Sequence, residues 1–339
     1  MKNLLPISIS LLILFGCQPE TNVSEKYISK IFEQRYSYKM ISSGDNFPDF
    51  NVRKDSLSQF LIALHLGIDK NEFQQFAGWT DDRLYENIEF LKSKNWLIEE
   101  DGLKPTIFIA TASVGNKLYE YGEIISEGIA DKIEFSLSDV KNMYDSLSFA
   151  TDNTFEELSF FLISDVLLDN WQINNVENEF LKTRERPVRH GKNYYYAIMQ
   201  NEQYPREQFG IYGNQYSSFN DSVMLITYGN NREKLHQRLK EDAFRDSLSN
   251  VAPTFTLEDQ RLLDQMAEQF KPQLLTLLES ERTHCKEIYH RTGYVHSITF
   301  DEFFIWWYHF IYTRTTDILA ERGILSIPKE GNYYVFMEK

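Results

Sequence analysis

Residues 80–110, TDDRLYENIEFLKSKNWLIEEDGLKPTIFIA, predict a helix that leads directly into a β-hairpin. Thr80 is of a residue type that caps helix N-termini. Leu84, Ile88 and Leu91 follow it on one helical face. The segment 96–110 then supplies two apolar, β-favouring runs separated by the polar turn Glu-Glu-Asp-Gly, which is typical of a hairpin.

Further helical patterns flank this stretch. Apolar residues at helical spacing predict a helix that begins near Leu57 and ends at Gly67, and a second helix over residues 69–79. A long helix over residues 113–133 follows the hairpin. Residues 55–150 are therefore expected to form one domain of three helices, a hairpin and a closing helix.

This order of elements resembles the winged helix-turn-helix domain of MarR- and PadR-type regulators. In that family the third helix finishes in a Leu, spacer, Gly-Leu-Ile phrase, and a Leu-Thr-x-x-Gly-x-x-Leu phrase follows the wing. The matching residues here are Leu91, Asn95, Trp96, Leu97, Ile98, Asp101, Gly102, Thr111, Gly115 and Leu118. Asn95 or Trp96 stands near the position of the family's glycine, and Ala110 replaces its leucine. The resemblance implies a winged-helix fold for this domain.

Charge argues against the family's usual function. DNA-binding versions need Lys and Arg on the third helix and wing to neutralise phosphates, whereas residues 81–101 carry more acidic than basic side chains. The whole chain has 50 acidic and 35 basic residues and a net charge of −15, which repels nucleic acid. We therefore expect no nucleic-acid partner, and expect basic or apolar protein partners instead.

The N-terminus has the pattern of a secretory signal peptide. Lys2 is followed by an apolar run over residues 4–15 that is too short for a permanent membrane span. The phrase Leu-Phe-Gly-Cys that ends at Cys17 resembles the lipobox of bacterial lipoproteins. That resemblance implies removal of residues 1–16, attachment of a diacylglyceryl group to Cys17, and acylation of the new amino terminus, commonly with palmitate. Several acyl chains anchor a protein stably in a membrane.

The predicted location follows from this anchor. Gln18 rather than Asp follows the cysteine, which in Gram-negative lipoproteins favours the outer membrane. Residues 17–54 would be a tether and an N-terminal helix over about residues 24–38, close to the membrane of the cell envelope. If the lipobox is false, the alternative is a cytoplasmic winged-helix DNA-binding regulator.

The C-terminal third repeats the order of helices and hairpin. Thr299 and Glu302 have the spacing of a capping box. The expected elements are helices over residues 257–280, 281–291 and 300–322 and strands over 324–327 and 333–337. Residues 251–339 are therefore expected to form a second winged-helix-like domain.

A short internal repeat links the middle of the chain to this C-terminal domain. Thr154-Phe-Glu-Glu precedes a Gly191-Lys-Asn-Tyr-Tyr phrase, and Thr299-Phe-Asp-Glu precedes Gly331-Asn-Tyr-Tyr in the same order. The repeat is either a duplication or two convergent sets of capping boxes and turns. Residues 151–250 would then be a middle helix-plus-hairpin region. The predicted fold class is α+β and helix-rich, with tandem winged-helix-like units, in a chain of 339 residues that is 42% hydrophobic.

The segment 303–312 is the most apolar of the mature chain and predicts a buried core helix. Its expected buried stripe is Phe303, Phe304, Trp307 and Ile311, with Glu302 and Tyr312 away from the stripe. The alternative is an interfacial or partner-binding helix.

Two sets of residues are candidate binding surfaces. The first is a basic island that could contact an anion or a partner, or could instead be a solvated hairpin balanced by neighbouring glutamates. It comprises Lys182, Arg184, Arg186, Arg189 and Lys192. The second is aromatic and could stack on a sugar or peptide, or could be ordinary sheet packing, since alternate tyrosines of a strand face opposite ways. It comprises Tyr194, Tyr196 and Tyr212.

Catalytic and cofactor motifs are absent from the sequence. No nucleophile elbow, phosphate-binding glycine loop or Ser-x-x-Lys phrase stands out, and the spacing of His284 and His290 does not favour a metal site. We predict no cofactor, no metal and no catalytic residues. Cys285 is the only cysteine besides Cys17, so a lipidated chain has no internal disulfide.

The predicted function is therefore a membrane-anchored, exported lipoprotein that acts as a protein-interaction or scaffold module. A glycan- or peptide-binding lipoprotein or a hydrolase is the other alternative. It would be distinguished by a concave, tyrosine-lined pocket in the middle region.

Overall fold

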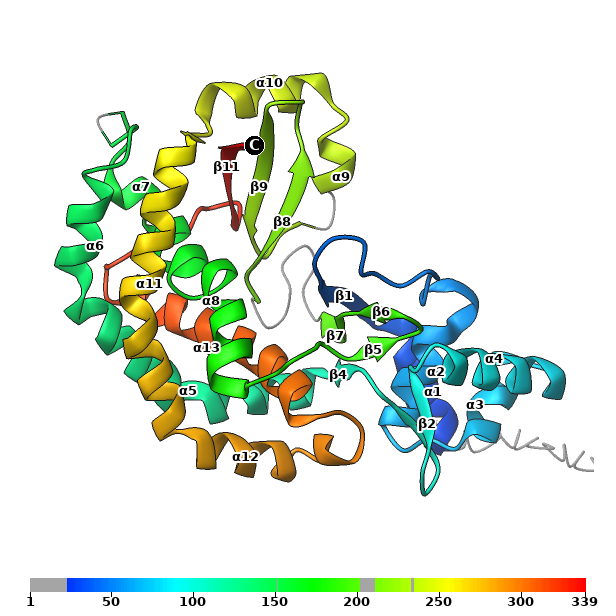
Figure 1. Cartoon of the computed structure of the whole chain (residues 1–339). Coiled ribbons are helices and arrows are strands. Elements are labelled where there is room, and N and C mark those ends of the chain that lie inside the picture. The colour runs from blue at the N-terminus through cyan, green and yellow to red at the C-terminus, as the bar shows by residue number, and fades with distance from the viewer. Residues whose placement is uncertain (1–22, 151, 202–210, 233–234) are drawn as a thin grey trace, which may run out of the picture.

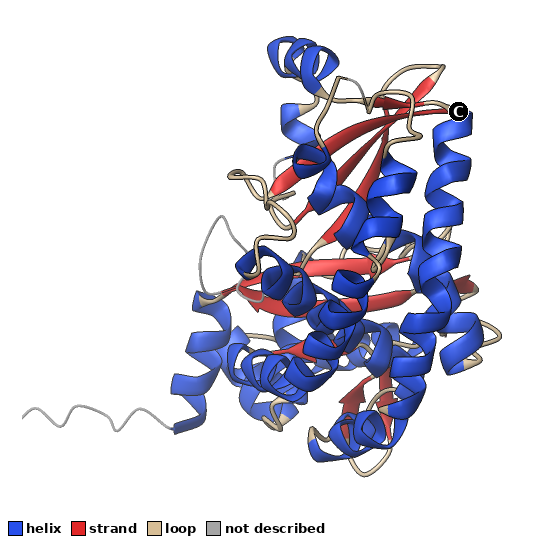
Figure 2. Ribbon diagram, turned by 90° about the vertical axis from the view of Figure 1, so that its left-hand side faces the viewer, coloured by secondary structure: helices blue, strands red, loops and turns tan. Residues whose placement is uncertain are grey.

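The computed structural model describes residues 23–150, 152–201, 211–232 and 235–339, and these form a helix-rich α+β fold (Figures 1 and 2). The coarse fold class predicted from sequence is confirmed. The predicted signal peptide and Cys17 lie outside the described residues. Within the described part of the chain, no helix has the length and apolar character needed to cross a bilayer.

The N-terminal unit has its own hydrophobic core, built around Phe60, Phe73 and Trp96. Its elements are α1 (Val23–Glu33), β1 (Arg35–Ile41), η1 (Lys54–Ser56), α2 (Leu57–His65), α3 (Lys70–Ala77), α4 (Asp81–Ser93), β2 (Leu97–Glu99) and β3 (Leu103–Pro105). The Thr80 side chain caps α4 by accepting a hydrogen bond from the Arg83 amide, as predicted. The predicted order of three helices and a hairpin is therefore present.

The hairpin is shorter than predicted. β2 pairs with β3, and residues 108–110 form β4 (Phe108–Ala110), which pairs in parallel with β7 (Tyr195–Asn201) in a separate sheet. Phe108 faces the main core of the molecule, whereas Ile109 faces the N-terminal core. All three residues of β4 are apolar, so the strand is stabilised by burial of both its faces. The position between the two cores buries both faces, and β4 therefore pairs with β7 instead of extending the hairpin.

The predicted N-terminal helix also ends early. α1 stops at Glu33, and β1 pairs antiparallel with β7 along its full length, from Arg35 opposite Asn201 to Ile41 opposite Tyr195. The sheet order β1-β7-β4 places β1 at one edge. Successive residues of β7 face different cores, since Tyr194 and Tyr196 lie in the N-terminal core and Tyr195 in the main core.

The rest of the described chain builds the main core and a small separate cluster of Leu225, Leu248 and Phe336. Its elements are α5 (Ala112–Phe135), α6 (Leu137–Tyr144), α7 (Phe155–Ser159), η2 (Phe160–Val166), α8 (Asn170–Asn175), η3 (Val176–Leu181), β5 (Val188–Arg189), β6 (Lys192–Asn193), β8 (Gly213–Ser218), β9 (Val223–Gly229), α9 (Leu235–Arg238), α10 (Asp242–Val251), β10 (Thr254–Phe255), α11 (Leu257–Ser280), α12 (Arg282–Arg291), η4 (Tyr294–His296), α13 (Phe300–Glu321) and β11 (Asn332–Glu338). The predicted helices 113–133, 257–280, 281–291 and 300–322 match α5, α11, α12 and α13 to within two residues.

The predicted C-terminal hairpin is wrong. Residues 324–327 are not a strand, and β11 pairs antiparallel with β9 and in parallel with β10. The ladder with β9 joins seven residue pairs, from Asn332 opposite Gly229 to Glu338 opposite Val223. β11 therefore forms seven residue pairs with the distant strand β9, whereas the predicted neighbouring strand, residues 324–327, could have formed only four. The second winged-helix-like domain therefore lacks its wing.

The structure favours the duplication over convergence. One half of the molecule contains β1, β4, α5, α6, α7–η2 and β7 in this order, with α8, η3, β5 and β6 added before β7. The other contains β9, β10, α11, α12, α13 and β11, with α9 and α10 added before β10 and η4 before α13. In each half the last strand pairs antiparallel with the first and in parallel with the second. α5 and α11 are both 24 residues long, and threonine side chains cap both of them. The three-helix and hairpin unit is inserted between β1 and β4 of the first half.

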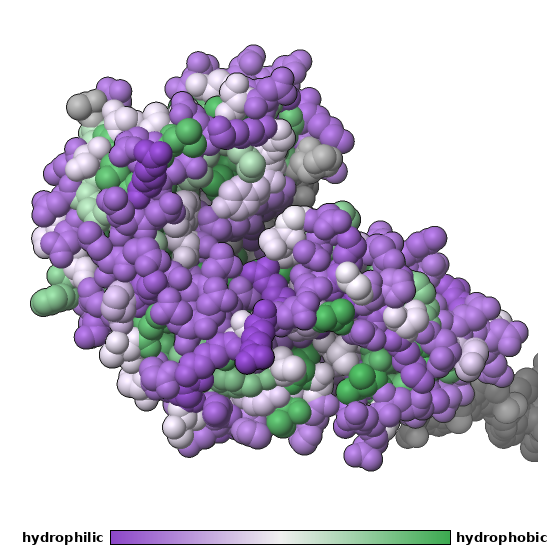
Figure 3. Space-filling view, viewed as in Figure 1, coloured by the Kyte–Doolittle hydropathy of each residue, from purple (hydrophilic) through white to green (hydrophobic). Residues whose placement is uncertain are grey.

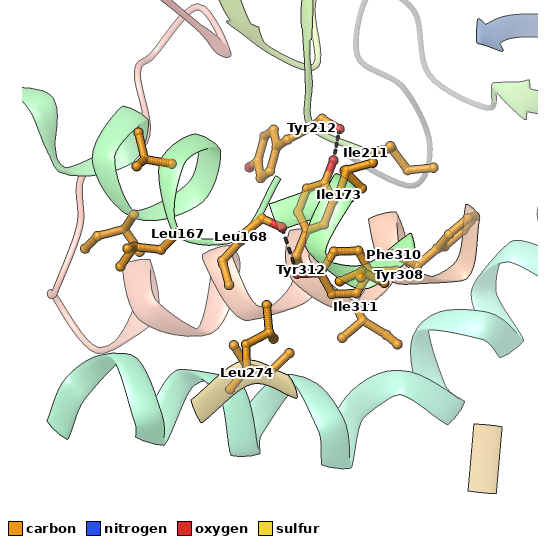
Figure 4. Close-up of a cluster of buried hydrophobic side chains, with 14 of the residues drawn as sticks. Leu167, Leu168, Ile173, Ile211, Tyr212, Leu274, Tyr308, Phe310, Ile311 and Tyr312 are labelled. Carbon is orange, nitrogen blue, oxygen red and sulfur yellow. Dashed lines mark hydrogen bonds between the residues drawn. The ribbon is translucent and has the colours of Figure 1, made fainter. Parts of the chain in front are cut away.

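α13 lies at the centre of the main core, packed against α5, α12 and η2 (Figure 4). The predicted buried residues Phe303, Phe304, Trp307 and Ile311 are all fully buried, so the core-helix prediction is confirmed. The prediction that Glu302 and Tyr312 lie away from the core is wrong, because both are buried as well. Neighbouring elements surround this part of the helix and leave it no solvent face.

Candidate functional site

A cavity of about 1020 Å³ lies between β1, α8, β8 and α13, and the hollow between the lobes of β1 and β8 is visible in Figure 3. This volume is at the upper end of typical small-molecule sites. Its wall includes every residue from 36 to 44 and every residue from 211 to 216. Tyrosines contribute to both segments, which is the feature expected of the ligand-binding alternative.

Asp169 lines one side of the cavity, and a second buried carboxyl group, that of Asp165, lies behind the wall next to Asn214. Asp165 is the sixth residue of η2, a π-helical segment, and Asp169 follows it by four residues and lines the cavity. Asp165 Oδ1 accepts a hydrogen bond from Asn214 Nδ2 at 3.3 Å. The Oδ2 atoms of both residues are buried and have no hydrogen-bond partner in the part of the chain that the structure describes. Unpartnered buried carboxyl oxygens are costly for folding and therefore indicate a functional site.

Burial shifts the pKa values of both acids upward. Desolvation, with the nearby charge of Asp169, raises the pKa of Asp165 well above its ordinary value. Desolvation raises the pKa of Asp169 to about 7, against the lowering effects of a hydrogen bond with Tyr312 and the charge of Arg232. Near neutral pH the cavity therefore contains a carboxyl group that can donate or accept a proton.

α13 supplies an imidazole and an indole to the same region. His309 Nε2 lies 3.9 Å from Asp169 Oδ1, and His309 Nδ1 lies 2.8 Å from the Ile305 carbonyl oxygen. Burial lowers the pKa of His309 to about 4, so the ring is neutral near pH 7. The Nδ1 hydrogen is donated to Ile305, which leaves Nε2 as an acceptor facing Asp169. Trp306 Nε1 is a buried donor without a partner in the protein.

The remaining wall is rich in amides and cations. The amide residues are Asn170, Asn174, Asn201, Asn214, Gln215 and Asn230. Lys39, Arg53, Arg186 and Arg232 also line the cavity, where Asp169 is the acidic residue among the described lining residues. Positive side chains therefore outnumber negative ones in the described lining of this cavity. The protein as a whole has the opposite balance, with a net charge of −15.

The predicted aromatic surface is only partly assembled. Tyr212 lines the cavity, but Tyr194 is buried in the N-terminal core and its hydroxyl accepts a hydrogen bond from Trp96 Nε1 at 2.9 Å. Tyr196 packs on Trp96 with ring centroids 4.5 Å apart. The three tyrosines therefore do not share one surface, because Tyr194 and Tyr196 face the core on the other side of their sheet.

The predicted basic island is divided as well. Arg189 is buried against Glu302, Lys192 pairs with Asp45, and Arg186 binds Glu177 through two hydrogen bonds. Lys182 and Arg184 are exposed. The five residues do not form one anion site, although Arg186 reaches the cavity wall.

The predicted histidine and cysteine residues play no part in the cavity. His284 Nε2 lies 3.1 Å from the Tyr121 carbonyl oxygen, and Cys285 is buried, which raises the pKa of its thiol to about 12. No three His, Cys, Asp or Glu side chains of the described segments lie close enough together to hold a metal ion.

The sequence reasoning missed Asp165, Asp169, Trp306 and His309. The sequence contained a signal for the two acids. Asp165 lies inside the apolar run 158–168, and Asp169 follows this run directly, four residues after Asp165. Acidic residues inside an apolar helical run are rarely exposed, and buried ones are usually functional or paired.

Comparison of the chain with protein-family models, curated proteins and solved structures gave no match. The chemistry of the cavity is therefore the basis for assigning a function.

Asp169→Asn should remove a pH-dependent loss of stability. The folded-state pKa of about 7 lies above the ordinary value of 3.8, so stabilisation by the protonated carboxyl is complete below pH 4 and is lost as the pH rises through 7. Relative to the unchanged protein, the neutral amide should raise the free energy of unfolding at pH 8 by up to about 4 kcal/mol and change it little at pH 4.5. Urea unfolding at the two pH values measures this difference.

The exposed Asp221→Asn is the matched control and should give the same small change at both pH values. Burial also lowers the pKa of His65 to about 4, and the contribution of His65 is common to both proteins and cancels in the comparison. Burial lowers the pKa of His309, which lies beside Asp169, to about 4, so its ring is neutral at pH 8. An Asp169→Asn variant that is equally destabilised at both pH values would contradict a raised Asp169 pKa.

Proposed function

We propose that this protein is an exported, lipid-anchored lipoprotein that binds a segment of a protein partner in the cavity between β1 and β8. The cavity itself carries the proposal, because its buried Asp169 Oδ2, Trp306 Nε1 and Arg232 Nε atoms have no hydrogen-bond partner among the described residues. A bound ligand would supply those partners and recover the cost of burying them.

The strand edges support a polypeptide ligand in particular. Successive side chains of a strand face opposite sides of its sheet, so a space bordered by consecutive residues lies along the strand's edge. Residues 36–41 of β1 and 213–216 of β8 border the cavity in this way, and both strands are at edges of their described sheets. Edge strands present backbone groups to which another chain can pair.

A peptide selection tests this function. A displayed library of ten-residue random peptides is selected on the purified full chain, and the enriched peptides are measured by calorimetry at pH 8. We expect Asp169→Asn to weaken binding by about tenfold, the effect of one hydrogen bond to a charged group. Asp221→Asn should leave binding unchanged. If no peptide binds, or if both variants bind equally, the cavity is not the peptide site.

A carbohydrate is the second candidate ligand. Six amide side chains and Tyr36, Tyr38, Tyr212 and Tyr216 line the cavity. Amides both donate to and accept from hydroxyl groups, and tyrosine rings offer flat apolar faces. An oligosaccharide array would support this candidate if Tyr216→Ala, a change at a 46% exposed residue, abolished binding.

We infer that α2, α3, α4 and the β2–β3 hairpin form a winged-helix-like platform for protein contact. Tyr85 is 67% exposed on α4, and the partly exposed rings of Phe32 and Phe76 lie 5.5 Å apart. Exposed aromatic groups are enriched at protein interfaces. The acidic N-terminal turn of α4, with Asp81 and Asp82, suits a protein rather than DNA.

Lipid anchoring through Cys17 is a separate proposal with its own test. Cells expressing the protein are labelled with radioactive palmitate, and the unchanged chain should incorporate the label into the membrane fraction. Cys17→Ser should abolish labelling, because the thiol that receives the diacylglyceryl group is missing. Cys285→Ser is the matched control and should label normally. Continued labelling of Cys17→Ser would refute the anchor.

A further inference from the structure

The matching strand order of the two halves identifies a strand position that is filled in one half of the molecule and, within the described residues, open in the other. β1 corresponds to β9, because each is a seven-residue strand that pairs antiparallel with the last strand of its half. Arg35 opposite Asn201 corresponds to Val223 opposite Glu338, at the same end of each ladder. The two strands can therefore be superimposed residue by residue from this end.

Within the described residues, the sheet of the second half has one more strand than the sheet of the first. β8 pairs antiparallel with β9, from Gly213 opposite Gly229 to Ser218 opposite Met224. The described sheet of the first half has the order β1-β7-β4, with no strand on the outer side of β1. Residues 224–229 of β9 pair with β8. When the two seven-residue strands are aligned, these residues correspond to residues 36–41 of β1.

These same residues of β1 border the cavity. Residues 36–41 are all part of its wall, and none of the seven residues of β1 is buried. The cavity thus adjoins the β1 edge at the position that β8 occupies beside β9. A chain in this position would continue the described sheet β1-β7-β4 on the outer side of β1.

The charges around this edge indicate the composition of the missing strand. Lys39 is on β1 itself, and Arg53 lies with its guanidinium carbon 4.3 Å from the ring centre of Tyr38 on the same strand. Arg232 extends from the loop after β9, where its Nη1 donates to the Asn214 carbonyl oxygen at 2.8 Å and its buried Nε has no partner in the protein. Acidic side chains on the ligand would pair with these cations.

We propose that an extended, acidic segment of a partner protein adds to the open edge of β1 as an antiparallel strand, in the position equivalent to β8. This inference rests on the proposed peptide-binding function and specifies its geometry and the chemistry of its ligand. Backbone hydrogen bonds to residues 36–41 would supply affinity, and carboxylates beside Lys39, Arg53 and Arg232 would supply selectivity.

Two peptide modifications test the two parts of the proposal. Peptides selected on the full chain are resynthesised with single N-methyl groups at each position in turn. Along an added strand, alternate amides face the partner strand, so binding should weaken by about tenfold at every second position and little at the others. Replacing Asp and Glu of the peptide by Asn and Gln should weaken binding by tenfold or more at low salt.

Hydrogen exchange locates the contact independently of affinity. Bound peptide should slow amide exchange in residues 35–41 and leave the β2–β3 hairpin unchanged. Lys39→Gln should reduce the preference for acidic over amide peptides, whereas Lys104→Gln, at a half-buried position on the distant hairpin, should not.

The outcomes separate this proposal from the proposed function. Peptides that bind without the alternating N-methyl pattern and without protection of β1 would overturn strand addition while leaving peptide binding intact. Equal binding of acidic and amide peptides would overturn the acidic ligand. Absence of any peptide binding would overturn the proposed function itself.

Discussion

Trp307→Ala is expected to lower the free energy of unfolding by about 3–5 kcal/mol, as truncation of a fully buried aromatic side chain usually does. Trp307 is completely buried, and its Nε1 donates to the Leu118 carbonyl oxygen of α5 at 2.8 Å. α5 and α13 approach closely here, because a Cβ atom on Gly122 would lie 3.1 Å from Ile311 and 3.6 Å from Trp307 Nε1. The substitution therefore removes both packing and a hydrogen bond.

The structure changes the expected scope of this effect. α13 belongs to a core shared by residues from both halves of the duplication, so the whole main core should unfold together rather than a separate C-terminal domain. Urea unfolding followed by circular dichroism measures the loss. Phe135→Ala is the control, since Phe135 is 84% exposed at the end of α5 and should change stability by less than about 0.5 kcal/mol. A Trp307→Ala protein with unaltered melting temperature that no longer binds a partner would identify α13 as an interaction helix instead.

Glu302→Leu should destabilise the protein by about 3–5 kcal/mol, because it leaves the Arg189 guanidinium buried without its counter-charge. Arg189 Nη2 lies 2.8 Å from Glu302 Oε2, and both side chains are 2% exposed. The same guanidinium donates to the carbonyl oxygens of Tyr194 and Thr106. This ion pair thus joins the start of α13 to the segments that lead into β4 and β7.

The double variant Arg189→Met with Glu302→Leu is the informative comparison. Apolar side chains of similar volume can replace a buried ion pair at little cost, so the double variant should be more stable than either single variant. Glu258→Gln is the matched control, because Glu258 and Arg261 form an ion pair in which both side chains are 71% exposed and should contribute less than about 1 kcal/mol. Equal losses for Glu302→Leu and Glu258→Gln would show that burial does not strengthen this pair.

The candidate site was less predictable than the fold. Tyr212 was one of three candidate aromatic contacts and does line the cavity, whereas Tyr194 and Tyr196 lie in a core on the other side of their sheet. The two acids and His309 were not identified, because their importance comes from burial next to one another. Asp165 and Asp169 are on the segment after α7, and His309 is on α13, about 140 residues later in a chain of 339.

The sequence alone determined the features that depend on neighbours within about four residues. Helix starts at Thr80, Thr154 and Thr299 were predicted because a side-chain oxygen caps an amide three residues away. The buried character of the segment 303–312 followed from its apolar composition, which no solvated helix would tolerate.

Tertiary structure decided which distant segments complete these local elements. Thr154 and Glu157 form the complete capping box, but the Glu302 carboxylate turns away from Thr299 to bind Arg189, which lies 113 residues earlier. β11 does not pair with the neighbouring segment 324–327. It pairs with β9, whose residues precede it by more than 100 positions in the sequence. Capping energies arise between residues that are close together in the chain. Strand pairing and the burial of charge depend on which surfaces come into contact after the chain has folded. The spacing of residues in the sequence does not specify these contacts.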